Sequence, residues 1–140
     1  NMNYRDLKVL IIDDDDSTLE VLSALTFKHF NIDSLLAFSA ENAFEIMKSI
    51  KPDLIILDLQ MPQINGYNFL AEIRSDEKLK DIAVVTCTAL GHKELIISIC
   101  QLGIEDYILK PIIPSLFINK IQKVLDKLLR NKINAEPIKN

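Results

Sequence analysis

The chain has 140 residues, of which 49% are hydrophobic and 26% charged, a composition that suits one globular domain with a single core. Its net charge is −4 without a concentrated block of lysine and arginine, which argues against nucleic-acid binding by this segment. No apolar run approaches the roughly 20 residues that span a bilayer, which argues against a membrane protein. Cys87 and Cys100 lack the spacing of a metal site or a disulfide framework, so we expect free thiols and a cytoplasmic location.

The first part of the chain alternates short apolar runs with segments of helical periodicity. Residues 8–12 form an apolar run that stops at four consecutive aspartates, as a buried parallel strand does. Apolar residues then recur at helical spacing over residues 17–30. Residues 33–38 are a weaker strand candidate, and Ser39 is a candidate N-cap for a helix that reaches Ile50.

The middle of the chain repeats this alternation around a loop that is rich in turn-forming residues. Residues 53–57 predict a third strand that stops at Asp58. The following loop contains Pro62 and Gly66, both typical of turns, before a predicted helix over residues 67–74.

The last part of the chain completes the pattern. Residues 82–87 predict a fourth strand, followed by a helix over residues 92–102 that Gly103 can terminate. Residues 106–109 predict a fifth strand, and residues 114–130 a final amphipathic helix. Five successive strand–helix units predict an α/β fold in which helices cover both faces of a parallel sheet.

Polar residues follow four of the predicted strands. The first strand is followed by Asp13 and Asp14, the third by Asp58, the fourth by Thr88 and the fifth by Lys110. Because the carboxyl ends of parallel strands share one edge of the sheet, we expect these side chains to meet there. Three converging carboxylates require a hard cation such as Mg²⁺. A metal, an ammonium group and a hydroxyl around Asp58 favour phosphoryl transfer to this carboxylate, which stands alone at the central strand.

The chain resembles bacterial two-component receiver domains in four segments. They are VLIIDDDDSTLEVL, PDLIILDLQMPQINGYNFL, VVTCTAL and GIEDYILKP, and they occur in the family's order and spacing. The resemblance covers residues 7–129. It implies a flavodoxin-like, doubly wound (βα)5 fold whose five parallel strands have the order 2-1-3-4-5. We expect the receiver domain at residues 4–130 and a polar tail or the start of a linker at residues 131–140.

The resemblance also implies a role for each residue at the acidic end of the site. Asp58 matches the phosphoacceptor. Asp14 matches the direct ligand of Mg²⁺, and Asp13 the acid that holds the metal through water. Gln60 lies where the family contributes a backbone carbonyl to the metal.

The remaining matches concern phosphate pairing and conformational switching. Lys110 matches the phosphate-pairing lysine and implies a cis Lys110–Pro111 bond. Thr88 matches the switch hydroxyl, and Tyr107 the aromatic residue that changes rotamer with it. An apolar Leu90, two residues after Thr88, favours slow self-dephosphorylation.

The function that the resemblance implies is that of a switch rather than of an enzyme in its own right. A histidine kinase or a phosphotransfer protein would phosphorylate Asp58, and the fourth helix, fifth strand and fifth helix would then change. The chain could be a stand-alone regulator, the receiver of a larger regulator or one domain of a hybrid histidine kinase. The sequence leaves its signal, output and oligomeric state open, a homodimer included.

Three other functions are alternatives to that of a phosphoacceptor domain. A hydrolase with an aspartyl-phosphate intermediate needs an acid two residues after the nucleophile, where Gln60 stands. A nucleotide-binding domain needs a glycine-rich phosphate loop, and the sequence contains neither GxGxxG nor GxxxxGK[ST]. A degenerate receiver that serves only as a docking module stays open, and titration with Mg²⁺ would separate it from a phosphoacceptor.

Overall fold

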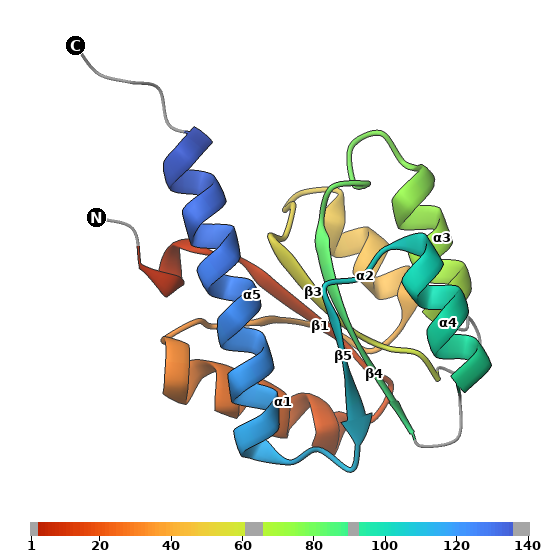
Figure 1. The fold of residues 1–140 in the computed structure, drawn as a ribbon, viewed down its shortest axis with the longest axis horizontal. Coiled ribbons are helices and arrows are strands. Elements are labelled where there is room, and N and C mark those ends of the chain that lie inside the picture. Colours follow the sequence, from red (N-terminus) through yellow and green to blue (C-terminus); the bar gives the residue numbers. More distant parts are fainter. Residues whose placement is uncertain (1–2, 61–65, 90–92, 136–140) are drawn as a thin grey trace.

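The computed structural model describes residues 3–60, 66–89 and 93–135, which form a five-stranded parallel sheet with helices on both faces (Figure 1). The strands are β1 (Val9–Ile12), β2 (Leu35–Ala37), β3 (Leu54–Asp58), β4 (Ala83–Ala89) and β5 (Asp106–Lys110). The helices are α1 (Asp16–Phe30), α2 (Ala40–Met47), α3 (Gly66–Ser75), α4 (Lys93–Leu102) and α5 (Pro114–Ala135), and a short 3-10 helix spans Tyr4–Asp6. The strand order is β2-β1-β3-β4-β5, which confirms the predicted doubly wound fold.

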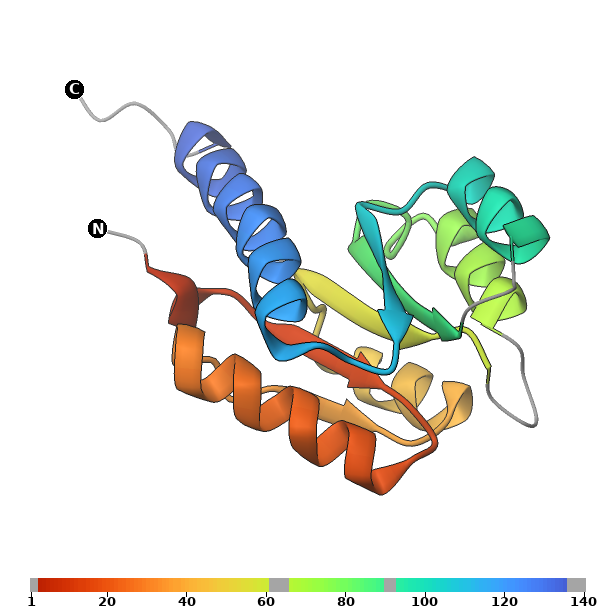
Figure 2. The same cartoon turned by 60° about the horizontal axis from the view of Figure 1, so that its bottom comes forward.

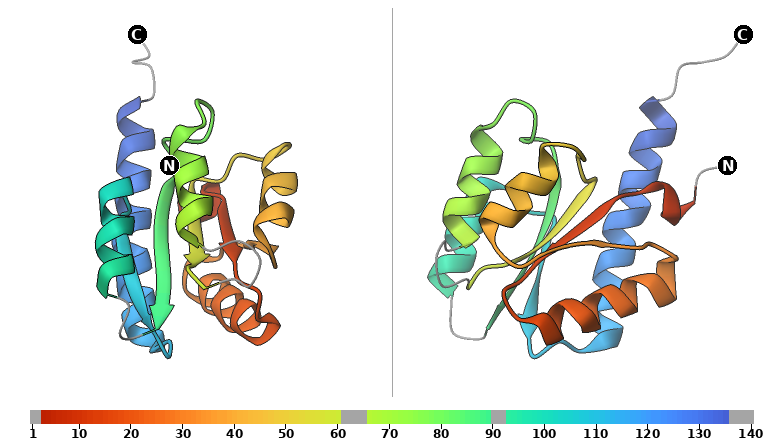
Figure 3. Two further views of the ribbon diagram at one scale, coloured as in Figure 1. Left: turned by 90° about the vertical axis from the view of Figure 1, so that its right-hand side faces the viewer. Right: turned by 180° about the vertical axis from the view of Figure 1, so that it is seen from behind.

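The sheet separates two hydrophobic cores because successive side chains of a strand point to opposite faces. Val9 and Ile11 of β1 belong to the core beneath α1 and α5, and Leu10 and Ile12 belong to the core beneath α2, α3 and α4. Figure 2 shows α1 and α5 together, and Figure 3 shows α3 and α4 side by side. Strands β1 and β3 are buried along their whole length, which is why they read as continuous apolar runs in the sequence.

Several local predictions agree with the structure. Ser39 caps α2, since its side chain accepts a hydrogen bond from the Asn42 N–H. Gly103 ends α4 with φ +100°, and its N–H donates to the Ile99 carbonyl. The Lys110–Pro111 peptide bond is cis.

Two helix boundaries differ from the prediction by more than one residue. Helix α2 ends at Met47 instead of Ile50, because the Ser49 N–H donates to the carbonyl three residues back, as in a 3-10 turn. Helix α5 continues past Arg130 to Ala135, so residues 131–135, predicted as part of a polar tail, are helical. The ion pair between Lys132 Nζ and Asp53 Oδ1, at 3.1 Å, helps to hold this extension against the domain.

Some predicted features lie outside the described residues. They are Pro62 in the third loop, Leu90 after the fourth strand, the helix start at residue 92 and the tail over residues 136–140. None of the helices in the described part of the chain combines the length and the apolar character that a bilayer span requires.

Candidate functional site

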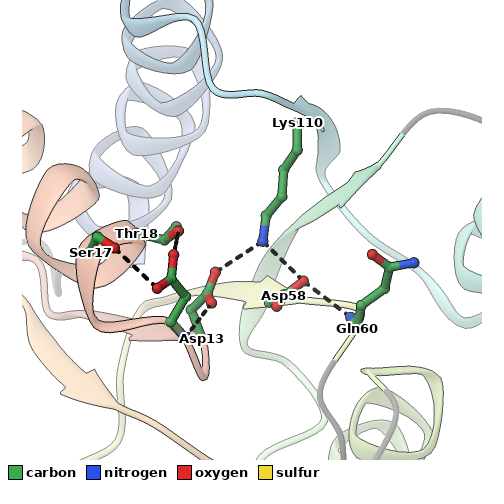
Figure 4. Close-up of polar contacts among 7 residues, drawn as sticks. Asp13, Ser17, Thr18, Asp58, Gln60 and Lys110 are labelled. Carbon is green, nitrogen blue, oxygen red and sulfur yellow. Dashed lines mark hydrogen bonds and ion pairs between the residues drawn. The ribbon is translucent and has the colours of Figure 1, made fainter.

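Three strand ends bring Asp13, Asp58 and Lys110 together at the carboxyl edge of the sheet (Figure 4). Asp13 directly follows β1, Asp58 is the last residue of β3, and Lys110 is the last residue of β5. The Nζ atom of Lys110 lies 3.2 Å from Asp13 Oδ2 and 3.4 Å from Asp58 Oδ1. The structure therefore brings together the residues that follow the first, third and fifth strands, as predicted.

The backbone holds both buried carboxylates in place. Asp13 Oδ1 accepts a hydrogen bond from the Asp15 N–H at 2.9 Å, and Asp58 Oδ1 accepts one from the Gln60 N–H at 3.1 Å. Each carboxylate thus contacts the backbone two residues further on, which fixes its orientation where the strand turns into a loop. The contact shown for Gln60 is through its N–H, so the role of its backbone carbonyl stays a prediction.

The three aspartates form a cluster of oxygen ligands. Asp13, Asp14 and Asp58 each offer one carboxylate oxygen, and these atoms all lie within 4.8 Å of one another. Asp13 and Asp58 are 2% and 3% exposed, whereas Asp14 is exposed to solvent. An oxygen-only ligand set on a small site open to solvent on one side fits Mg²⁺, which keeps part of its water shell.

Burial and charge act together on the ionisation of this site. Burial raises the pKa of Asp58, and the nearby charge of Asp13 raises it further, against the opposing effects of the Gln60 N–H and Lys110. Burial by itself would lower the pKa of Lys110, but the charges of Asp58 and Asp13 outweigh it and hold that pKa above its ordinary value. The ammonium group is thereby kept charged between two carboxylates that repel each other.

Helix α1 begins directly beside this cluster. Asp15 is its N-cap, and its carboxylate accepts hydrogen bonds from the hydroxyl groups of Ser17 at 3.1 Å and Thr18 at 2.6 Å (Figure 4). The hydroxyl groups of Thr18 and then Ser17 lower the pKa of Asp15. Asp15 therefore organises the first turn of α1, where a negative charge is favourable to the helix dipole.

The two predicted switch residues lie on neighbouring strands, and neither forms a hydrogen bond with Asp58 in this structure. Thr88 on β4 is fully buried, and its hydroxyl donates to the Ala89 carbonyl at 3.4 Å. Tyr107 on β5 is 36% exposed and lies in register with Thr86, two residues before Thr88. Figure 4 accordingly contains neither residue among the contacts of the acidic cluster.

One residue next to β5, the strand that carries Tyr107, was not predicted from the sequence. Lys120 on α5 contacts Asp106 and Tyr107 through its ammonium group. It is one of several lysines on a helix whose polar residues read as a solvated surface, and no local pattern marks its partners on β5.

Comparisons with known proteins agree with this fold. The family model of the response regulator receiver domain matches residues 9–122, and the chain belongs to this family. It is therefore a receiver domain of the kind that acts in two-component phosphorelay signalling. The acidic pocket of this family is known to bind Mg²⁺, and the cluster of aspartates described above is present here.

Individual relatives differ in size and architecture. The chain is 28% identical over 123 residues to the chemotaxis protein CheY1 of Helicobacter pylori, which covers 85% of this chain and 97% of that protein. It is 31% identical over 103 residues to the hybrid signal transduction histidine kinase D of Dictyostelium discoideum, covering 74% of this chain and 6% of the kinase. The crystal structure of a two-component response regulator from Clostridium difficile superposes with a TM-score of 0.79 at 25% identity, over 87% of this chain and 98% of that one.

The coverage of other relatives is partial. The chain spans about half the length of the first curated relatives that it matches, which are described as transcriptional regulators, with 49%, 54% and 45% of their residues covered. Receiver domains of this kind thus occur in these relatives as parts of larger proteins.

Proposed function

We propose that Asp58 is the phosphoacceptor of this receiver domain and that a histidine kinase or a histidine phosphotransfer protein is the donor. The observation that carries this proposal is the contact between Asp58 and Lys110 beside a cluster of three carboxylates. Asp58 ends the central strand, next to β1 and β4, so a group bound to it lies in the middle of the carboxyl edge. Asp13, the other buried carboxylate, lies to one side and adjoins Asp14.

The chemistry of this transfer follows from the side chains present. A carboxylate oxygen of Asp58 forms a bond to phosphorus while the P–N bond of a phosphohistidine breaks, and the imidazole leaves with the electron pair and takes up a proton. The Lys110 ammonium group neutralises negative charge on the phosphoryl oxygens, and the Thr88 hydroxyl is the donor that would turn toward them. When bound, Mg²⁺ supplies further positive charge at these oxygens.

Asp13, Asp14 and Asp58, with the backbone carbonyl of Gln60, would hold that Mg²⁺ ion. The two buried carboxylates fit this role because burial, and to a smaller extent the charge of Asp13, raises the pKa of Asp58, and a divalent cation would favour its ionised form. With free Mg²⁺ at ten times its Kd, the free energy of unfolding should rise by about 1.4 kcal/mol. A thermal or urea unfolding titration measures this change. Absence of any shift would favour a docking module without phosphoacceptor chemistry.

The proposed role is that of a switch, and the domain itself is not an enzyme beyond its own phosphorylation and dephosphorylation. Phosphorylation would draw Thr88 and Tyr107 inward and change the face formed by α4, β5 and α5, where an output domain, a target or a second copy could bind. We propose a cytoplasmic location for this domain, because the free thiols of Cys87 and Cys100 are compatible with a reducing compartment.

The test uses as its control Asp53, a carboxylate that directly precedes β3. The wild-type protein, Asp58→Asn and Asp53→Asn are incubated with acetyl phosphate and Mg²⁺, and intact masses are measured. We expect the wild-type protein and Asp53→Asn to gain one phosphoryl group that hydroxylamine removes, and Asp58→Asn to gain none. Uptake of a phosphoryl group by Asp58→Asn would overturn the assignment.

A further inference from the structure

Lys120 reaches from α5 to the outer edge of β5, where it makes three contacts within two adjacent residues. Its Nζ atom lies 2.6 Å from the Tyr107 carbonyl oxygen and 3.2 Å from Asp106 Oδ1. The same atom lies 4.9 Å from the centroid of the Tyr107 ring. This is the geometry of a cation–π interaction, made here with the exposed orientation of the ring.

We propose that Lys120 is a positioning residue that holds Tyr107 in its exposed orientation and so opposes the phosphorylated state of the switch. The inference rests on the proposed function, in which Tyr107 turns inward when Asp58 carries a phosphoryl group. Lys120 then shifts the equilibrium between the exposed and the inward orientation of Tyr107 without contacting the acidic cluster.

The three contacts of Lys120 divide into two that persist and one that depends on the Tyr107 rotamer. The Tyr107 carbonyl belongs to the backbone, and the Asp106 carboxylate belongs to the neighbouring residue, so rotation of the Tyr107 side chain changes neither. These two contacts fix the ammonium group in place over the edge strand. The ring lies against it in the exposed orientation only.

A contact that exists in one of two states shifts the equilibrium between them by its own strength. Cation–π interactions at exposed sites correspond to a change of about two- to fivefold in an equilibrium constant. Lys120 is therefore expected to favour the exposed orientation by this factor. By reciprocity, a ligand of Asp58 that draws Tyr107 inward must bind more weakly by the same factor.

The test measures binding of beryllofluoride with Mg²⁺, a complex that takes the place of a phosphoryl group on a carboxylate. The bound fraction is read from the fluorine NMR signal of the complex. Lys120→Met keeps most of the length of the side chain and removes its charge, and Lys120→Arg keeps the charge. Lys127→Met is the matched control, because Lys127 lies two turns further along α5 and pairs with Glu105 at 3.0 Å.

We expect Lys120→Met to bind beryllofluoride about two- to fivefold more tightly than the wild-type protein. Lys120→Arg and Lys127→Met should bind it as the wild-type protein does. In a Tyr107→Leu background the effect of Lys120→Met should vanish, because the ring that it acts on is gone.

The results of these binding measurements distinguish an error in the role of Lys120 from an error in the proposed function. An unchanged or weaker affinity in Lys120→Met, or a gain that persists in the Tyr107→Leu background, would overturn the role of Lys120 alone. A wild-type protein that binds no beryllofluoride would overturn the proposed function, and the role of Lys120 with it.

Discussion

The ammonium group of Lys110 lies 3.4 Å from Asp58 Oδ1, in a site where it also contacts Asp13 at 3.2 Å. One cation thus balances two buried carboxylates, and the site depends on it in the absence of metal.

The first prediction concerns the loss of this cation. Lys110→Met leaves Asp13 and Asp58 facing each other unpaired. Breaking a fully buried ion pair costs about 3–5 kcal/mol. Because the Lys110 side chain is 27% exposed, we expect a smaller loss in the free energy of unfolding, roughly 1–3 kcal/mol. Urea unfolding in EDTA measures it, and Mg²⁺ should restore part of it. Equal stability of the two proteins in EDTA would contradict the assigned pairing.

The second prediction concerns pH. The pKa of Asp58 is raised in the folded protein, so its ionised form is less favourable there than in the unfolded chain. The contribution of Asp58 to the free energy of unfolding is present at low pH, where its carboxyl group is protonated. This contribution is lost as the pH rises through the raised pKa of Asp58. In EDTA at neutral pH, Asp58→Asn should therefore be more stable than the wild-type protein.

This difference should shrink as the pH falls into the ordinary carboxyl range, because Asp58 is then protonated in both the folded and the unfolded chain. Unfolding curves of the two proteins at several pH values measure it, and other carboxylates cancel in the comparison. A wild-type protein that is the more stable of the two at neutral pH in EDTA would contradict the sign of the shift.

The third prediction concerns Gly66, the first residue of α3, which lies close to the backbone of Leu59 and Asp58. A Cβ atom at Gly66 would lie 2.6 Å from the Leu59 Cα atom and 3.0 Å from the Asp58 carbonyl oxygen. Both neighbours are backbone atoms that cannot turn away. Gly66→Ala should lower the free energy of unfolding by about 1–3 kcal/mol and, by displacing Asp58, slow its phosphorylation by acetyl phosphate. Ser75→Ala, at the exposed end of the same helix, should change both properties little.

The fourth prediction concerns two buried threonines. The Thr86 hydroxyl is buried without a hydrogen-bond partner, whereas the hydroxyl of the equally buried Thr26 donates to the Leu22 carbonyl at 2.7 Å. Thr86→Val removes an unsatisfied polar group and should raise the free energy of unfolding by about 1 kcal/mol. Thr26→Val removes a hydroxyl group that has a hydrogen-bond partner, so it should not stabilise the protein. The same change in both variants would show that the missing partner is not the cause.

The fifth prediction concerns a guanidinium group that joins three segments. Arg74 on α3 donates two hydrogen bonds to the Gly103 carbonyl, at 3.2 and 2.8 Å, and one each to the carbonyls of Lys80 and Ile82, at 2.9 and 2.8 Å. A lysine cannot reproduce this planar fork. Arg74→Lys should lower the free energy of unfolding by roughly 2–3 kcal/mol. Arg130→Lys, on an exposed stretch of α5, should stay within about 0.5 kcal/mol of the wild-type protein.

The fold and the convergence of Asp13, Asp58 and Lys110 could be predicted because both follow from local sequence patterns. Strands β1 and β3, which are buried on both faces, read as apolar runs, and each run stops at an aspartate on the same edge of the sheet. The resemblance to receiver domains added the strand order and the cis Lys110–Pro111 bond, and the structure contains both.

The contacts of Arg74, Lys120 and Gly66 could not be predicted in the same way. Arg74 meets Gly103 across 29 residues and Lys120 meets Tyr107 across 13, so their partners are set by the packing of helices on the sheet. The continuation of α5 to Ala135 was hidden for the same reason, since it is supported by Lys132 and the distant Asp53. Gly66 looks like an ordinary turn glycine until its distance to the Leu59 backbone is known.

The burial of the strands is uneven across the sheet. All five residues of β3 are buried. Asp53, which precedes the strand, pairs with Lys132, and Asp58, which ends it, pairs with Lys110. In the described part of the chain, Ile108 is the buried residue of β5 and Ile99 that of α4. Asp58 thus ends a strand that is buried along its whole length, whereas Lys110 ends an edge strand with little buried surface. Strands with few buried contacts open locally at a lower free energy, so we expect local opening near this site to separate Lys110 from Asp58 before it disturbs Asp58 itself.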